Sequence, residues 1–405
     1  MIHNPFLSDI FKSVWSKHFC KNKAVFKFSF LDGPSFFKPS SLPIYVNIGK
    51  NLTKGISYTP LDSDTPDHRG KTFLLYDVPH FFNTNTDKHP KGLKVYKAKQ
   101  YPGFLINLDS YSDLNNYMTS TFSKSSRYKL NKYKKRLEDS FDISYKMLIG
   151  DVAKDEYDKV FEHFKNLLQK RFLEKQITNN NLDPKEWDFY HEVTYPMILE
   201  KQACLFVIYE REKPIEVTLS YLSENILFDA ITVFDIDFAK FHLGSVTIMK
   251  LIEWCLENQF KVLDFSKGYF DYKTRWANKT YDFEYHIWYD SKSLYASILA
   301  FSIKTYFTLK QKLREKNINT KLHRLRFFLK NSKAESTEDP IMNYQFSEST
   351  QIFDLTQLDR ITLDDDINGH LKPMVFDFLY LNSEKLNDVA LYKIDNNSNS
   401  YLISG

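Results

Sequence analysis

The chain has 405 residues, a formal net charge of +4 at pH 7 and a hydrophobic fraction of 42%, with 35 Phe and 26 Tyr. This length exceeds one ordinary core and indicates two or three domains, and the aromatic content excludes a disordered or low-complexity chain. The small net charge implies no partner by itself, so only local clusters of charge can indicate one.

The sequence also limits the compartment. It has no run of about 18 uncharged apolar residues, which argues against a membrane-spanning helix, and its first residues lack the pattern of a secretory signal. The cysteines, Cys20, Cys204 and Cys255, are odd in number and widely spaced, which argues against a disulfide framework. No His, Cys and carboxylate cluster occurs at ligand spacing, so we expect no metal. We expect a cytoplasmic protein.

Residues 1–145 begin with short aromatic and β-branched runs at 25–31, 44–48 and 72–78, separated by Gly and Pro, which predict strands and loops. A basic amphipathic helix follows over 124–136, with Leu130, Tyr133 and Leu137 on one side. Its cations are either the solvated face of a docked helix or a patch that meets the phosphates of a nucleotide-bearing donor or of an RNA.

The next segment predicts a core helix over 157–168, a helix from Asp183-Pro184 to about Lys201, and an antiparallel meander of strands at 204–209, 216–222 and 226–234. A polar loop then reaches Gly244-Ser245 and opens an amphipathic helix that ends near Asn258. A helix start carries unpaired amides and partial positive charge, and a glycine there lets a phosphate approach the backbone.

The stretch 260–276 is the densest in usable chemistry. It predicts a short strand, a break at Gly268 and a polar loop that contains Tyr272, Lys273 and Arg275. Residues 281–289 predict another strand, and 294–330 predict two helical segments separated at 317–320. The cations of 304–330 suit an anionic membrane surface or an RNA, or they are the solvated face of a docked helix. A linker at 332–349 and a small strand-containing appendage at 353–403 complete the chain.

Residues 241–276 resemble the core of the GNAT acyltransferase superfamily, in particular the CelD-like acyltransferases related to the Fem-type (FemAB-like) aminoacyl transferases. The resemblance depends on the helix start at Gly244, on Leu263-Asp264-Phe265 with Gly268, and on Tyr272-Lys273-x-Arg275-Trp276. It extends less sharply from 123 to 288. The family commonly has a Glu two residues past the glycine, whereas this chain has Phe270 there and Asp271 beside it.

The resemblance implies an α/β (α+β) fold in which helices flank a mixed sheet, doubled with a degenerate first half. We therefore expect an amino-terminal GNAT-like domain at 1–145, a GNAT acyltransferase domain at 146–330, and a linker with the appendage at 331–405. It also implies an acetyl-CoA or other acyl-CoA co-substrate, gripped by the backbone at Leu243, Gly244 and Ser245, with the flanking His242 and Arg275.

Acyl transfer requires a gripped donor, an acceptor that loses a proton and a stabilised oxyanion. We expect Lys273 to face the oxyanion or donor phosphate and Tyr272 to donate a proton to the leaving group. Asp229 and Asp271 are the candidate carboxylate bases, because a partly buried carboxylate can have a raised pKa. Asp264 is expected to hold the loop through side-chain to backbone bonds.

The hypothesis is an N- or O-acyltransferase that acts on an amine or hydroxyl of a small-molecule or cell-envelope-related acceptor. Two alternatives stay open. In the first, the protein is a Fem-type ligase that uses aminoacyl-tRNA. In either enzyme, the segments 124–136 and 304–330 are the expected contacts with tRNA or with an anionic membrane at its inner face. In the second, the protein is a non-catalytic binding module with a GNAT fold.

Overall fold

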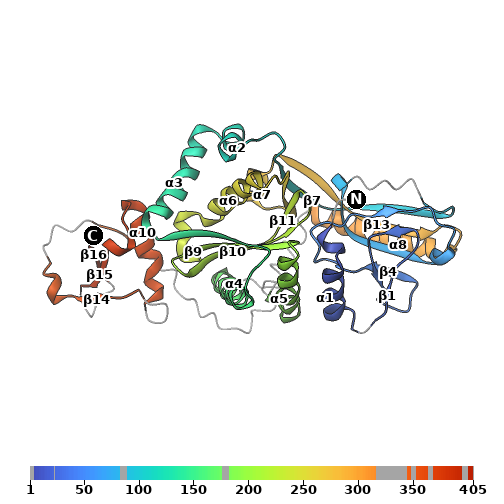
Figure 1. Cartoon of the computed structure of the whole chain (residues 1–405), viewed down its shortest axis with the longest axis horizontal. Helices are drawn as coiled ribbons and strands as arrows, with labels where there is room; N and C mark the ends of the chain where they lie inside the picture. The colour runs from blue at the N-terminus through green and yellow to red at the C-terminus, as the bar shows by residue number, and fades with distance from the viewer. Residues whose placement is uncertain are drawn as a thin grey trace.

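The computed structural model describes residues 4–21, 23–82, 89–175, 182–315, 344–347, 353–363, 368–394 and 400–404. Most of the described strands form one large mixed sheet with helices on both faces, and a small unit at one end carries the last residues (Figure 1). The predicted fold class, a mixed sheet flanked by helices with a small carboxyl-terminal appendage, is confirmed.

Within the described residues, the large sheet has 11 strands in the order β1-β3-β4-β6-β13-β7-β12-β11-β10-β9-β8. Their bounds are β1 Val25–Phe26, β3 Phe36–Phe37, β4 Ile44–Asn47, β6 Thr72–Pro79, β7 Leu93–Asn107, β8 Ile143–Leu148, β9 Ala203–Glu210, β10 Lys213–Leu222, β11 Ile226–Phe234, β12 Val262–Lys267 and β13 Lys279–Asp290. Strands β2 (Leu31–Asp32) and β5 (Thr59–Pro60) form a separate pair.

The two halves of the large sheet have related strand arrangements on either side of its centre. Strand β7 follows the first half of the chain but pairs with β12, while β13 follows the second half but pairs with β6. The two exchanged strands pair with each other in the middle. Each half also contains one parallel pair, β4 with β6 and β11 with β12. This symmetry supports the predicted duplication, and the boundaries at residues 145 and 330 stay predictions.

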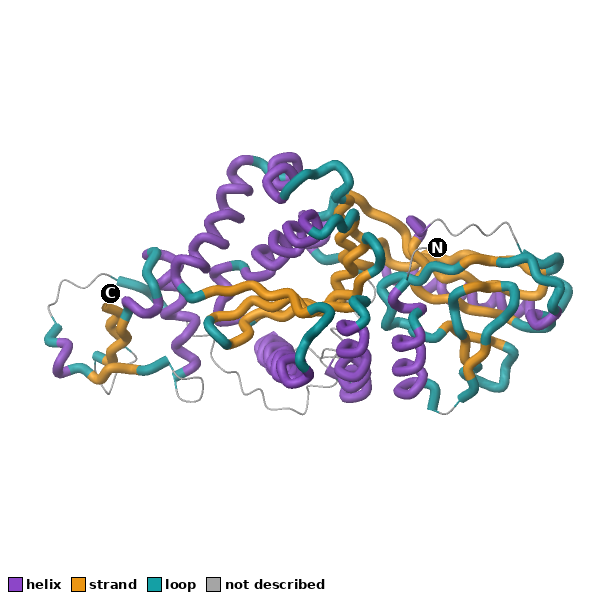
Figure 2. The backbone as a smooth tube through the Cα atoms, in the orientation of Figure 1, coloured by secondary structure: helices purple, strands orange, loops and turns teal. Residues whose placement is uncertain are grey.

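Helices cover the two faces of the second half of the sheet differently. Helices α4 and α5 lie on one face, and α3, α6 and α7 lie on the other (Figure 2). The α-helices in the described part of the chain are α1 Asp9–Phe19, α2 Leu114–Thr121, α3 Lys124–Ser140, α4 Lys154–Lys175, α5 Pro184–Leu199, α6 Leu243–Glu257, α7 Asp271–Trp276, α8 Leu294–Glu315 and α10 Lys372–Asn382. The helices predicted at 124–136, 157–168, 183–201 and 245–258 are confirmed, as is the antiparallel meander of β9, β10 and β11.

Some local predictions were wrong or incomplete. Residues 271–276 form the short helix α7 rather than a loop. Helix α1 and strand β7 were not predicted. Strand β7 was missed because it contains Pro102-Gly103, a pair that usually indicates a turn. Glycine is needed at this position of the strand because a Cβ on Gly103 would lie 2.2 Å from the ring of Tyr281. The second helical segment predicted within 320–330 and most of the predicted linker lie outside the described residues.

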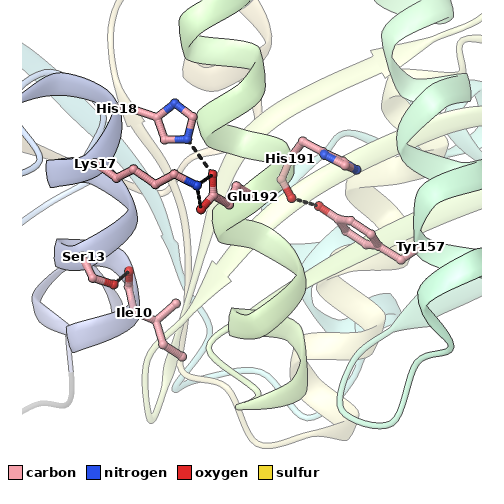
Figure 3. A network of polar contacts seen from close by, with 7 residues as sticks. All are labelled: Ile10, Ser13, Lys17, His18, Tyr157, His191 and Glu192. Atoms are coloured by element: carbon pink, nitrogen blue, oxygen red, sulfur yellow. Dashed lines mark hydrogen bonds and ion pairs between the residues drawn. The ribbon is translucent and has the colours of Figure 1, made fainter.

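Helix α1 of the first half packs against α5 of the second half (Figure 3). The Lys17 ammonium donates to both carboxylate oxygens of Glu192 at 2.7 and 2.8 Å, and Nε2 of His18 lies 2.8 Å from the same carboxylate. Beside this polar contact, the rings of Phe11 and Phe189 meet edge to face at 5.6 Å. The two halves are therefore joined by side chains as well as by the shared sheet.

The appendage is a three-stranded antiparallel sheet of β14 (Asp359–Ile361), β15 (Ala390–Lys393) and β16 (Tyr401–Ser404) together with α10. The apolar run at 375–381 is helical rather than extended. Phe376 on α10 packs against Phe141 and Phe238, with ring centroids 4.9 and 4.7 Å apart. These aromatic contacts attach the appendage to the second half of the chain, beside the turn that precedes α6.

Candidate active site

The candidate site lies where strands β11 and β12 stop pairing. They pair in parallel over Ile226–Phe228 and Val262–Asp264. Past this point β11 runs on to Phe234 alongside β10, while β12 bulges between Asp264 and Lys267 in its pairing with β7. Asp229 is the first residue of β11 beyond the paired section. Where two adjacent strands diverge, their backbone N–H and C=O groups no longer pair with each other, and a ligand can bind to them.

The bulge in β12 is held by a buried carboxylate. Ser266 has a φ of +59°, in the left-handed region that a non-glycine residue rarely occupies. Its amide donates to Oδ1 of Asp264 at 2.7 Å, and the Tyr281 hydroxyl reaches both carboxylate oxygens at 2.7 and 2.8 Å. Burial raises the pKa of Asp264 to about 7. Asp264 therefore holds the backbone, as the sequence predicted.

Lys273 lies under this bulge and is almost fully buried. Its ammonium donates to the carbonyl oxygens of Phe265 at 2.6 Å, Lys267 at 3.1 Å and Ser266 at 3.4 Å. These three hydrogen bonds use all three protons of the ammonium, so Lys273 can donate to an oxyanion only by giving up one of them. The contact with Ser266 is the longest and therefore the weakest of the three. Burial lowers the pKa of Lys273 to about 8, against the opposing effect of the Asp229 carboxylate.

Asp229 is partly exposed and faces two cations. Burial raises its pKa, while Lys273 and Lys54 lower it and the Thr232 hydroxyl donates to it at 3.0 Å. A carboxylate whose pKa is raised towards neutrality is a better proton acceptor than an ordinary one at pH 7. Of the two carboxylates proposed as bases, Asp229 is the one that the fold brings next to Lys273.

A chain of hydroxyl groups leads from Asp229 to a buried carboxyl. Oγ1 of Thr232 lies 2.9 Å from Oγ1 of Thr218, which lies 2.6 Å from Oε1 of Glu216. Three contacts join the two carboxyls, but each of the two hydroxyl groups has one proton to donate. The third contact needs a proton on one of the carboxyl groups.

Burial places that proton on Glu216. Glu216 is fully buried, whereas Asp229 is partly exposed and faces Lys273 and Lys54. Burial raises the pKa of Glu216 well above its ordinary value, and the nearby Asp229 carboxylate acts in the same direction. Oε2 of Glu216 makes no direct hydrogen bond within the described residues, and the nearby Thr247 hydroxyl acts to lower the pKa of Glu216 against the larger effect of burial.

The remaining predicted catalytic residues lie on α7. Tyr272 is 41% exposed and its ring packs edge to face on Phe265 at 5.8 Å. Partial burial and the Asp229 carboxylate both raise the pKa of Tyr272, so it keeps its proton at neutral pH. Asp271 is exposed at the start of α7, where its charge suits the helix dipole.

The predicted donor-binding residues gather at the start of α6. His242 has a φ of +51° and ends the 3₁₀ turn Ile236–Phe241 just before the helix. The Ser245 amide donates to the His242 carbonyl oxygen at 2.8 Å, which leaves the amides of Leu243 and Gly244 as those a donor can use. A Cβ at Gly244 would lie 3.3 Å from the ring of Phe234, so the helix starts against the last residue of β11.

His242 and Arg275 lie near each other. The exposed His242 ring packs on the Tyr133 ring of α3, with centroids 4.0 Å apart and the ring planes tilted by 31°. Partial burial, and then the positive charge of Arg275, lower the pKa of His242. Arg275 lies 5.8 Å from the centroid of the Phe122 ring. The structure thus brings α3, α6 and α7 together around the predicted donor site.

The sequence did not reveal several charged residues at the site. Lys54 of the first half faces Asp229, and Lys267 pairs with the buried Asp77 while donating to Gln100 at 3.1 Å. The partners in each of these pairs lie more than a hundred residues apart in the sequence, so motif spacing could not predict the contacts. Glu216 gave one signal, because it is a single acid within a strand of apolar and hydroxyl residues. Among the described residues, no three His, Cys, Asp or Glu side chains group as a metal site would require.

The comparisons identify the class of domain. Residues 124–274 match the family model of the acetyltransferase (GNAT) domain, a range that runs from α3 to α7 and contains Asp229, the α6 start and Lys273. The match covers less than half of the chain, and it confirms the resemblance to the GNAT superfamily found in the sequence. Comparison with curated proteins finds no match.

Several solved structures resemble the chain weakly. A conserved protein of unknown function from Bacteroides thetaiotaomicron VPI-5482 is 10% identical, with 71% of this chain and 91% of that chain covered and a TM-score of 0.46. FemX is 9% identical, with 69% and 91% covered and a TM-score of 0.44. L-PGS from Bacillus licheniformis is 12% identical, with 72% and 91% covered and a TM-score of 0.42. These values are too low to transfer a function.

Proposed function

We propose that this protein is an acyltransferase that moves an acyl group from acyl-CoA to an amine or hydroxyl of a small-molecule or cell-envelope-related acceptor. The observation that carries the proposal is the position of Asp229 and Lys273 at the point where β11 and β12 diverge, inside a segment that matches the GNAT domain. Acetyl-CoA is the simplest donor of this class.

The donor is held at the start of α6. The amides of Leu243 and Gly244 point from the first turn of a 15-residue helix, where backbone donors and the helix dipole favour a phosphate. Gly244 lets the pyrophosphate of CoA approach the backbone, and Arg275 adds positive charge beside His242. The thioester then extends along β11 towards Asp229.

The chemical step combines a base with a positive charge. The acceptor nitrogen or oxygen attacks the thioester carbonyl carbon, Asp229 takes the proton that it loses, and the sulfur of CoA leaves with the bonding electron pair. Lys273 places its ammonium near the developing oxyanion, and Tyr272 can donate a hydrogen bond to the leaving sulfur. Protonated Glu216 keeps the hydroxyl chain donating towards Asp229, which orients the carboxylate. Asp271 is the alternative base.

Donor binding tests this proposal directly. Isothermal titration with acetyl-CoA and with free CoA should show binding to the wild-type protein. The Gly244→Glu variant should lose it, because a carboxylate would stand over the amides. The Ser245→Ala variant is the matched control and should bind as the wild type does, because the grip is by backbone groups. If neither ligand binds at high micromolar concentration, the acyl-CoA donor is excluded.

A tRNA-linked donor is the second candidate, and the cations of α3 favour it. Lys124, Lys129 and Lys135 are exposed on this helix, next to the proposed donor site. A filter-binding assay with charged tRNA should then show strong binding that weakens steeply with salt. Of the second predicted contact at 304–330, only 304–315 lies within the described residues.

A substitution at the proposed base distinguishes an enzyme from a non-catalytic binding module. Asp229→Asn should abolish transfer and leave CoA binding intact, because the amide cannot accept the proton. A protein that only binds a partner would keep its cellular phenotype after this change, whereas an enzyme would lose it while remaining folded.

We further propose a cytoplasmic location at the inner face of the membrane.

A further inference from the structure

Helix α8 packs on the first half of the sheet with one narrow face. Ala296, Ala300 and Phe307 are buried on this side. The Phe307 ring stacks on Tyr285 of β13 with centroids 3.7 Å apart and meets Tyr76 of β6 edge to face at 5.8 Å. This stripe is enough to hold the helix to the protein, so the rest of its surface is free for another role.

The opposite face of α8 is apolar and exposed, unlike that of an ordinary surface helix. Leu294, Ile298 and Phe301 follow the three-and-four spacing of one outward stripe, which Leu309 continues, and they are 78%, 54%, 58% and 55% exposed. Tyr295, Tyr306 and Leu313 line its edge and are 41 to 59% exposed. A contiguous exposed apolar face of this kind marks an interaction surface. Of the alternatives that the sequence left open, a solvated basic face fits least well, because the outermost positions are mostly apolar.

The charges around this face have one sign. From Ser291 to Arg314 the chain contains no Asp or Glu, while it contains Lys292, Lys304, Lys310, Lys312 and Arg314. Lys304 lies over the Tyr96 ring and Arg314 over the Tyr101 ring, each with the cation 4.6 Å from the centroid. Lys304 lies at the edge of the helix, whereas Arg314 lies on the side that packs on the sheet, five helical turns after the buried Ala296. Lys312 is exposed on the apolar face itself. Long cationic side chains can lie along apolar surface and direct their charges to a polar layer.

We propose that the outer face of α8, defined by Leu294, Tyr295, Ile298, Phe301, Tyr306, Leu309 and Leu313, binds flat on an anionic lipid bilayer surface. Apolar side chains would enter the headgroup boundary while Lys312 on this face and Lys304 at its edge meet lipid phosphates and carboxylates. A second copy of the chain fits less well, because a symmetric contact would bring this acid-free segment against itself. An RNA fits less well, because it is bound mainly through cations and the outermost positions are mostly apolar.

Vesicle cosedimentation of the full chain tests the proposal. The wild-type protein should sediment with vesicles that contain phosphatidylserine and remain in solution with phosphatidylcholine vesicles. The double variant Ile298→Ser, Phe301→Ser should reduce partitioning by about tenfold or more, because each side chain contributes apolar burial. Lys312→Glu should weaken binding less and make it less sensitive to salt. The matched control is Leu381→Ser, an exposed leucine on α10 that is 53% exposed and should bind as the wild type does.

The outcomes distinguish the occupants of this face. Unchanged melting temperatures would show that the variants fold, since the substituted side chains are exposed. Equal binding to neutral and anionic vesicles, or binding unaffected by the double variant, overturns the proposal. So does a dimer in light scattering that the double variant dissociates without any vesicle binding. The assay has no catalytic readout, so its failure would leave the proposed acyl transfer untouched.

Discussion

The buried carboxyl of Glu216 provides a quantitative test of the site. The hydroxyl chain requires a proton on one of its two carboxyl groups, and full burial assigns it to Glu216. Glu216→Gln replaces a neutral acid with a neutral amide of nearly the same shape. The amide nitrogen can donate to Thr218 as the protonated acid does, so the variant should keep the fold and the chain of contacts.

The magnitude follows from the ordinary pKa of a glutamate. In the unfolded chain Glu216 titrates near 4.5, so keeping it neutral at pH 7 in the folded state costs about 3.5 kcal/mol of stability (about 2.5 pKa units at about 1.4 kcal/mol each). The sign follows from proton binding. Because the folded-state pKa is raised, the contribution of Glu216 is fully present below pH 4.5 and is lost as the pH rises. The glutamine variant lacks this loss.

Urea unfolding from pH 4.5 to pH 7 measures the effect. We expect similar free energies of unfolding near pH 4.5 and a variant more stable by about 3.5 kcal/mol at pH 7. The control is Glu224→Gln, an exposed carboxyl that should show no such divergence. A difference between wild type and Glu216→Gln that does not change with pH would mean that Glu216 is ionised, and the proton assignment would be refuted.

Three further predictions concern the surrounding structure. Lys273→Met should remove a lysine whose pKa is lowered to about 8, so the stability of the wild type relative to this variant should rise by up to about 3 kcal/mol between pH 8 and 10.5, and a flat difference in urea unfolding would contradict it. Gly103→Ala should displace the Tyr281 ring and lower the free energy of unfolding by about 1–3 kcal/mol, measured by thermal melting; an unchanged melting temperature would contradict the contact. Glu192→Gln should cost no more than about 1 kcal/mol, because its pair with Lys17 is largely exposed, and a much larger loss would show that this contact controls docking of α1.

The elements of the second half could be predicted because their periodicity is local. The apolar stripe of α4 and the alternation of β9, β10 and β11 are each contained in one stretch of sequence. Strand β7 could not be predicted in the same way. Its Pro102-Gly103 signals a turn, and only the Tyr281 ring, far along the chain, makes glycine necessary within a strand.

The site residues also differ in whether they could be predicted, according to whether their partners are close in sequence. Tyr272, Lys273 and Arg275 were found because they are close in sequence, and Asp229 because it precedes the loop. The hydroxyl chain to Glu216 depends on the pairing of β10 with β11, and Lys54 reaches Asp229 from the other half of the chain. For α8 the sequence left a membrane surface, an RNA and a solvated basic face open, because it shows the cations but not which side of the helix packs on the sheet.

The most direct test of the central claim is a crystal structure of the protein with CoA. The account predicts the pyrophosphate over the amides of Leu243 and Gly244, and the thiol end between the diverging strands β11 and β12, within reach of Asp229 and Lys273. CoA bound elsewhere, or a pyrophosphate that does not contact the start of α6, would contradict it.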